Sequence, residues 1–266
     1  MHVHYAIQTC DTSFNQVSLR YCNTNKSLVV RKCVTSFFES VKHAANQDHH
    51  AKHVIMIIDD HSTADTVSYL KKLVYCYTRK NVACSFLSLA ASGVMESIRA
   101  TYEWLRDNGI DLVYQVQDDY LFHPKGVSEM VDISNQLWKD CNARIVVSPW
   151  NRSELWKGSY RYWASPRTVV VGKHRYWIQL YDTSCTFLTH VQLLKEQWDI
   201  IEVFLGLPPK GLSDGSLESV SLNYMFTKRG ILGLMPVDSL ALHIQSENDK
   251  DPHIDWKKWW DGVKLV

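Results

Sequence analysis

The chain has 266 residues, a formal net charge of +1 and 21% charged residues. A chain of this length can bury a full core, so we expect one large domain rather than two small ones. The near-neutral charge, without a basic stripe or an acidic tail, gives no support for nucleic acid or an anionic membrane as a partner.

The cysteines and the first residues of the chain indicate the cellular compartment. The seven cysteines are an odd number at scattered spacing with no CxxC pair, which favours reduced thiols over disulfides or structural zinc. The first residues read directly as a strand without a signal-peptide pattern, and no apolar stretch approaches the roughly 18 residues that span a bilayer. We therefore expect a cytoplasmic protein without a transmembrane segment, in the host cytoplasm if the source is viral.

Strand-like and helix-like segments alternate along the first half. Apolar runs predict strands, and apolar residues at helical spacing predict helices. In chain order we expect strands at 3–9, 53–58, 81–89 and 111–117, with helices at 28–45, 63–77, 92–109 and 123–140. This alternation predicts an α/β fold in which helices cover both faces of a mostly parallel, Rossmann-like sheet, in three layers.

The second half is less regular. Residues 150–180 are rich in Trp, Tyr and Arg and hold several short strand candidates. Around them we expect a strand at 143–150, helices at 189–206 and 213–230, and a late strand at 233–245. No internal repeat or linker separates the two halves.

Two pairs of aspartates end two of the predicted strands. Asp59 and Asp60 follow HVIMII, and Asp118 and Asp119 follow DLVYQVQ. The carboxyl ends of parallel strands form the edge at which open α/β sheets bind ligands. Carboxylates at this edge can hold Mg²⁺ or Mn²⁺, which neutralises a diphosphate leaving group. For Asp59 and Asp60 the alternative is a helix cap, which Ser62 or Thr63 can also supply.

These motifs resemble glycosyltransferases of the GT-A fold, in particular the inverting, family 2-like type. The resemblance rests on IQTCD at 7–11, MIIDDHS at 56–62 and YQVQDDYLFHP at 114–124, although the last departs from a strict DxD. It implies a single GT-A domain with a nucleotide-sugar-binding half at 1–123 and an acceptor-binding half at 124–266. It also implies a UDP-sugar donor, a carbohydrate-type acceptor and a divalent cation.

The resemblance assigns roles to individual residues. Asp119 and the late His243 would ligate the metal, and Asp118 would contact the ribose or a metal-bound water. Asp60 would accept the uracil N3–H. The other residues expected to bind the nucleotide are Thr9, Asp59, Arg99 and Lys250.

The catalytic base and the acceptor site are expected in the second half. An inverting transfer needs a carboxylate beside the acceptor hydroxyl. Asp214 and Glu218 lie at a predicted helix start, and Asp182 is a third candidate; Asp214 is slightly favoured. Trp156 and Trp163 are expected to be exposed for stacking on a sugar ring.

We therefore expect a metal-dependent glycosyltransferase of bacterial or viral type that moves a sugar from UDP to a glycan, lipid-linked or protein acceptor with inversion. A retaining enzyme is one alternative, because 243–253 resembles a late His-Gly-Lys segment, without its glycine. A sugar-phosphate nucleotidyltransferase is another, although the loop QTCDTSFNQ lacks the glycines typical of that class. The third is an inactive GT-A domain that binds nucleotide or glycan.

Overall fold

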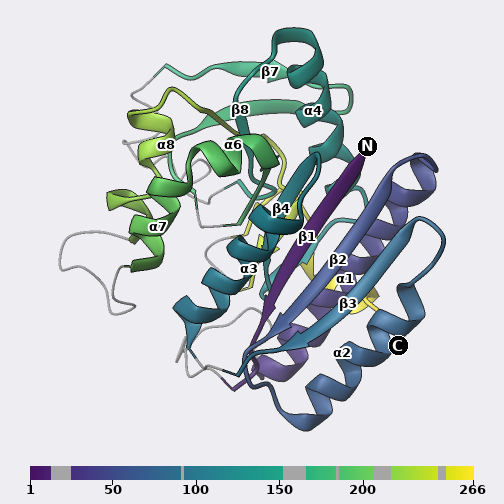
Figure 1. Cartoon of the computed structure of the whole chain (residues 1–266). Helices are drawn as coiled ribbons and strands as arrows, with labels where there is room; N and C mark the ends of the chain where they lie inside the picture. The colour runs from purple at the N-terminus through teal and green to yellow at the C-terminus, as the bar shows by residue number, and fades with distance from the viewer. Residues whose placement is uncertain (13–24, 91–92, 152–165, 184–185, 207–216, 245–249) are drawn as a thin grey trace.

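The computed structural model describes residues 1–12, 25–90, 93–151, 166–183, 186–206, 217–244 and 250–266 (Figure 1). Within these ranges nine strands form one sheet in the order β3-β2-β1-β4-β9-β6-β10-β8-β7. The strands are β1 (His2–Thr9), β2 (Lys52–Asp59), β3 (Val82–Ser88), β4 (Leu112–Gln117), β6 (Ile145–Val147), β7 (Val169–Val171), β8 (Tyr176–Leu180), β9 (Phe187–His190) and β10 (Leu232–Pro236). All of them except β9 and β8 point the same way, which confirms the predicted mostly parallel α/β sheet.

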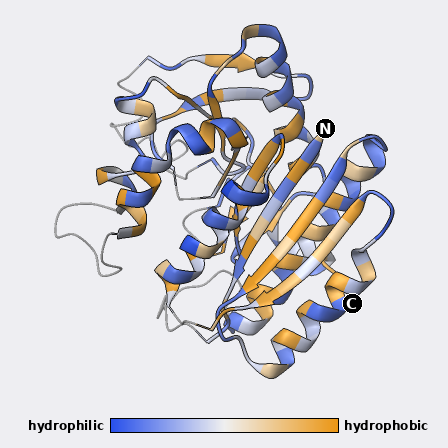
Figure 2. Cartoon of the chain, in the orientation of Figure 1, coloured by the Kyte–Doolittle hydropathy of each residue, from blue (hydrophilic) through white to orange (hydrophobic). Residues whose placement is uncertain are grey.

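Helices cover both faces of this sheet (Figure 1). One face packs against α1 (Lys26–Gln47), α2 (Ala64–Tyr77) and α4 (Gly126–Cys141), and the other against α3 (Val94–Asn108), α6 (Val191–Glu196) and α7 (Trp198–Gly206). Because β1 lies between two layers, alternate residues face different cores: Tyr5 and Ile7 face α1, while Ala6 faces α3. Burial on both faces explains the continuous apolar run in the middle of β2 (Figure 2).

A second, two-stranded sheet lies outside the main one. It pairs β5 (Tyr120–Phe122) with β11 (Ala241–His243) in antiparallel register, and α9 (Trp256–Gly262) packs beside it against α1. Trp256 and Trp260 are buried there, so much of the aromatic tail belongs to the core. The predicted late strand at 233–245 is therefore wrong as one element, because its two parts, β10 and β11, join different sheets.

Two predicted helices are also wrong in their extent. The segment 189–206 begins as the end of β9, because His190 pairs with Leu112, and its helix is interrupted at Gln197 between α6 and α7. Of 213–230, the described part holds only a 3₁₀ turn (Leu217–Val220) and α8 (Tyr224–Thr227). The chain turns at Gly230, whose φ of 65° a residue with a side chain rarely adopts. No helix in the described part of the chain is both long enough and apolar enough to cross a bilayer.

Candidate functional site

The parallel register brings the two aspartate pairs to one edge of the sheet. β1 lies between β2 and β4, with Thr9 opposite Asp59 and Gln8 opposite Gln117. The first residues after these three strands therefore meet at the carboxyl edge, as the sequence predicts. The edge is acidic and largely buried: Asp59, Asp60 and Asp118 are each less than 8% exposed.

Hydrogen bonds from the surrounding protein hold the first pair. The Asp59 carboxylate accepts bonds from the Thr9 hydroxyl (2.9 Å) and the Ser62 N–H (3.2 Å). Asp60 accepts a bond from the Gly93 N–H (3.0 Å) and lies 3.0 Å from His61 Nδ1. Asp59 thus orients the loop after β2, while Asp60 ties that loop to the start of α3.

The loops after β1 and β2 are joined by a third acid, Asp11. Its carboxylate accepts bonds from the N–H and the hydroxyl of Thr63, both 2.7 Å. Burial alone would raise the pKa of Asp11, but the bonds from Thr63, Thr66 and Ser27 outweigh it and lower that pKa. Thr63 is the N-cap of α2 by position, yet its side chain makes no capping bond, because its hydroxyl faces Asp11.

Asp118 lies in a pocket of protein donors. Lys26 Nζ is 2.5 Å from one carboxylate oxygen, and the Cys10 N–H donates to the other at 2.8 Å. Burial raises the pKa of Asp118 and nearby Asp119 adds to this, while Lys26 opposes it. Burial would lower the pKa of Lys26, but the charges of Asp118 and Asp119 raise it.

Lys26 is a site residue that the sequence did not reveal. It is the first residue of α1, which begins two residues before the predicted helix. The signal was the preceding Asn25, whose side chain caps the helix by accepting a bond from the Leu28 N–H. Extending the helix to this cap places Lys26 at the same edge as the acids.

Asp119 faces His243 across the small sheet. Asp119 Oδ2 lies 3.3 Å from His243 Nε2, and both side chains are at most 15% exposed. The His243 ring stacks on Tyr120, with centroids 4.6 Å apart and planes 10° apart, and Trp150 meets it edge-on. Pairing of β5 with β11 places His243 opposite Tyr120, next to Asp119.

The Asp119 carboxylate and the His243 imidazole suit a metal ion that also binds a phosphate. A carboxylate and an imidazole are suitable ligands for Mn²⁺, and Mg²⁺ sites at phosphates often use one or two protein carboxylates. The described residues include no group of three His, Cys, Asp or Glu side chains arranged around one metal. Asp119 and His243 could therefore hold an ion whose remaining ligands come from a diphosphate.

The candidates for the base are only partly described. Asp214 lies outside the described residues, as do Trp156 and Trp163. Glu218 and Asp182 are brought together by Asn223, whose amide donates to Asp182 Oδ1 at 2.8 Å and whose N–H donates to the Glu218 carbonyl at 2.9 Å. Asn223 also accepts a bond from the Thr183 N–H, so this bridge fixes two loops.

Arg99 and Lys250 are the remaining residues expected to bind the nucleotide. Arg99 lies 3.4 Å from the Leu205 carbonyl of α7 and 3.8 Å from Glu103 of its own helix, so the first contact joins α3 to α7 and neither involves the aspartates of the carboxyl edge. Lys250 is exposed in the segment that follows β11. Among the described aromatic residues of 150–180, Trp150 and Trp177 are buried and Tyr176 is 59% exposed.

Comparisons with known proteins support the fold. No protein-family model and no curated protein matches this sequence. Among solved structures, the chain is similar to a UDP-glucose pyrophosphorylase from Acinetobacter baumannii, with 10% identity, a TM-score of 0.51 and coverage of 100% of this chain and 96% of that one. It is also similar to a nucleoside-diphosphate-sugar pyrophosphorylase from Vibrio cholerae (10% identity, TM-score 0.47, 97% and 99% covered). A third is the bifunctional glycosyltransferase WbbM (11%, TM-score 0.42, 77% and 34% covered). The first of these similarities shows that the chain has a Rossmann-like α/β fold like that of the UDP-glucose pyrophosphorylase.

Proposed function

We propose that this protein is an enzyme that binds a nucleotide sugar at the carboxyl edge and transfers a group with the help of Mn²⁺ or Mg²⁺. The observation that carries the proposal is the pairing of Asp119 with His243, beside Asp118 and Lys26. This edge combines carboxylates for a divalent cation with an ammonium group for a phosphate. The fold, shared with a UDP-glucose pyrophosphorylase over the full chain, supports the same class.

Each described residue has a defined part in this proposal. Asp119 and His243 hold the metal, which supplies Lewis-acid stabilisation of the diphosphate when it is bound. Lys26 lies at the same place and offers a second positive charge to the phosphates. Thr9, Asp59 and Asp60 form the nucleoside end, where the buried carboxylate of Asp60 accepts the N–H of a uracil.

Two reactions fit this site, and different observations favour them. The full-length structural similarity favours nucleotidyl transfer, in which a sugar phosphate attacks the nucleotide and pyrophosphate leaves. The chain's own residues favour glycosyl transfer: the loop after β1 has no glycine, and Asn223 links the Asp182 carboxylate to the backbone of Glu218, two of the candidate bases. In glycosyl transfer with inversion, one of these acids takes the proton of the acceptor hydroxyl while UDP leaves.

The first experiment is calorimetric titration of UDP, with Mn²⁺ and with EDTA, into wild type, Asp119→Ala and Asp140→Ala. Asp140 is an exposed aspartate at the end of α4, so its replacement removes the same charge elsewhere. We expect Mn²⁺-dependent binding in wild type and Asp140→Ala, and its loss in Asp119→Ala. UDP binding to none of the three proteins would overturn the proposal.

The second experiment separates the reactions. Pyrophosphate release from UTP and glucose 1-phosphate would establish nucleotidyl transfer. Hydrolysis of a UDP-sugar, also lost in Asp119→Ala, would establish glycosyl transfer, and the configuration of the released sugar would separate inversion from retention. UDP binding without either reaction would identify a non-catalytic nucleotide-binding domain.

A further inference from the structure

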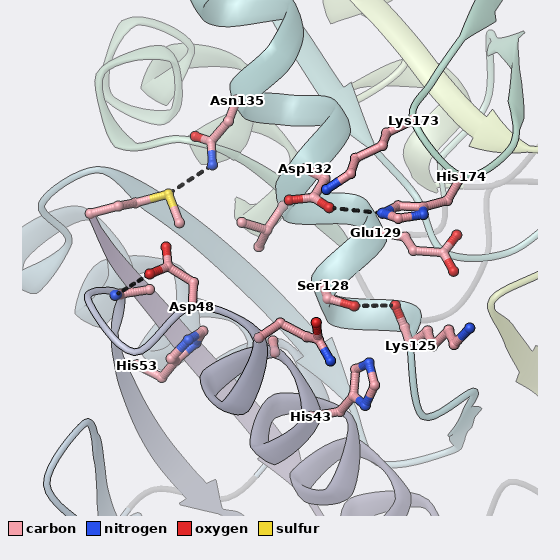
Figure 3. Close-up of a pocket in the computed structure, with 15 residues that line it drawn as sticks. His43, Asp48, His53, Lys125, Ser128, Glu129, Asp132, Asn135, Lys173 and His174 are labelled. Carbon is pink, nitrogen blue, oxygen red and sulfur yellow. Dashed lines mark hydrogen bonds and ion pairs between the residues drawn. The ribbon is translucent and has the colours of Figure 1, made fainter.

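A cavity of about 390 Å³ lies at the other end of the sheet, where β1 and β2 begin (Figure 3). The end of α1, the first half of α4 and the turn between β7 and β8 complete its wall. Along β2, about 20 Å of strand separates His53 in this wall from Asp59 at the carboxyl edge, at ~3.3 Å per residue. The cavity is therefore a separate place from the candidate site.

The acidic side chains of this wall already have partners. Asp48 accepts bonds from the His50 and Ala51 N–H groups, at 2.9 and 3.3 Å. Glu129 is paired with Arg175, and Asp132 lies 3.2 Å from His174 Nε2. Figure 3 shows the contact between Asp132 and His174 across the upper part of the cavity. The negative charge of the wall is thus directed to groups of the protein itself.

The lysines of the wall do not have such partners. Neither Lys125 nor Lys173 makes an ion pair or a side-chain hydrogen bond with any residue that the structure describes. They come from different elements, Lys125 from the start of α4 and Lys173 from the turn before β8, and both line the cavity. His43 of α1 adds an imidazole to the same wall.

His53 supplies a buried polar atom in the same wall. It is 2% exposed; its Nδ1 lies 2.8 Å from the Tyr5 hydroxyl, and its Nε2 has no hydrogen-bond partner in the described part of the chain. Burial raises the pKa of Tyr5, so its hydroxyl stays protonated and can donate to Nδ1, which leaves the proton of a neutral imidazole on Nε2. A buried donor without a partner is costly, and an oxygen atom of a ligand would satisfy it.

We propose that this cavity is a second ligand site, which takes a small phosphorylated molecule of about the size of a sugar monophosphate. Its volume lies in the range of about 300–1,000 Å³ that is usual for small-molecule sites. Lys125 and Lys173 supply the charge for the phosphate. Ser128 and Asn135 on α4 line the cavity and are suited to hydroxyl groups. This inference does not rest on the proposed function of the carboxyl edge.

The test is calorimetric titration of glucose 1-phosphate in EDTA, with glucose and inorganic phosphate as separate probes. The proteins are wild type, Lys125→Ala/Lys173→Ala, the control Lys195→Ala/Lys228→Ala and Asp119→Ala. The control removes two lysines that are exposed outside this wall. We expect binding of glucose 1-phosphate to wild type, to the control and to Asp119→Ala, and at least tenfold weaker binding to the Lys125/Lys173 variant.

Three outcomes would overturn the inference: no binding to wild type, unchanged affinity in the Lys125/Lys173 variant, or loss of binding in Asp119→Ala alone. Binding of glucose as tight as that of glucose 1-phosphate would also contradict the part assigned to the phosphate. A second measurement observes the wall directly, because the NMR signal of His53 Nε2 should move when glucose 1-phosphate is added to wild type. No movement of that signal at saturating ligand would contradict contact with His53.

Discussion

The two ends of the parallel sheet carry polar residues of opposite kinds. β1 and β2 begin with histidines and a lysine, and they end in Thr9, Asp59 and Asp60, beside Asp118 and Asp119 of the neighbouring strand end. Between the ends the strands are apolar and buried. The middle of each strand therefore determines packing, while its ends determine chemistry.

The ends also differ in the kind of buried polar group that they hold. At the carboxyl end the acids Asp59, Asp60 and Asp118 accept hydrogen bonds from protein donors. At the amino end, His4 Nδ1 and His53 Nε2 are buried without a hydrogen-bond partner among the described residues. An acidic edge of this kind attracts cations, whereas the proton on His53 Nε2 at the amino end suits an oxygen atom of a ligand. Changes at each end should therefore have different consequences.

The largest effect is expected at Asp119. Asp119→Asn keeps the size of the side chain but removes the charge that faces His243 and, in our proposal, the metal. We expect Mn²⁺-dependent turnover to fall about 100- to 1,000-fold, as when one group that stabilises transition-state charge is lost. Thermal unfolding should change little. Turnover within threefold of wild type, with the substrates that the assays above identify, would contradict the role of Asp119.

A large effect on stability is expected from Lys26→Met. Lys26 and Asp118 form a largely buried ion pair, and removal of one partner leaves the other charge uncompensated. We expect a loss of about 3 kcal/mol in the free energy of unfolding by urea, most of it recovered in Lys26→Met/Asp118→Asn.

The control for this change is Lys257→Met. Lys257 and Asp261 form an ion pair of the same length, 2.5 Å, but both side chains are more than half exposed. Loss of an exposed pair costs about 0.5 kcal/mol or less. An equally small loss in Lys26→Met would show that burial does not make the Lys26–Asp118 pair contribute more to stability than the exposed Lys257–Asp261 pair.

We expect acid to lower the free energy of unfolding through His53, which lies at the amino end of the sheet. Burial, with a smaller contribution from Arg79 and against the effect of Asp48, lowers the pKa of His53 from 6.5 to about 4. The unfolded chain therefore takes up a proton on this residue first. The stability that His53 contributes is complete above pH 6.5 and is lost as pH falls from 6.5 towards 4.

At ~1.36 kcal/mol per pKa unit, the loss between pH 7 and pH 4 is about 3 kcal/mol. We expect urea unfolding to show this loss in wild type and a correspondingly smaller one in His53→Gln. The lowered pKa values of His4, His123 and His190 act in the same direction, so some acid sensitivity should remain in the variant. An unchanged pH dependence in His53→Gln would assign the effect to these other histidines.

The first half of the fold was predictable from sequence because its signals are local. Each strand from β1 to β4 is an apolar run, and the helices between them show apolar spacing or a stop such as Gly109. The second half depends on pairing between distant, short segments. β6 has three residues and lies between β9 and β10, which come later in the chain, and no local pattern indicates that order.

The candidate site shows the same limit. The aspartates were visible because they end strands, and His243 because it follows an apolar segment. The partners were not visible: Lys26 meets Asp118 across 92 residues of sequence, and Asn223 meets Asp182 across 41. Such contacts follow from the way the helices and loops pack against the sheet, which the local sequence does not specify.

The smallest of these effects is expected at Asp59, and it separates the two aspartate pairs. Asp59 accepts bonds from Thr9 and Ser62 and is 1% exposed, so Asp59→Ala leaves two buried donors unsatisfied. We expect a loss of about 2 kcal/mol in the free energy of unfolding. Mn²⁺ binding in the presence of UDP should weaken less than in Asp119→Asn, because the oxygens of Asp59 are directed to the loop after β2. Equal weakening of Mn²⁺ binding in the two variants would mean that both pairs act on the metal, and the division between a loop-holding pair and a metal-holding pair would be wrong.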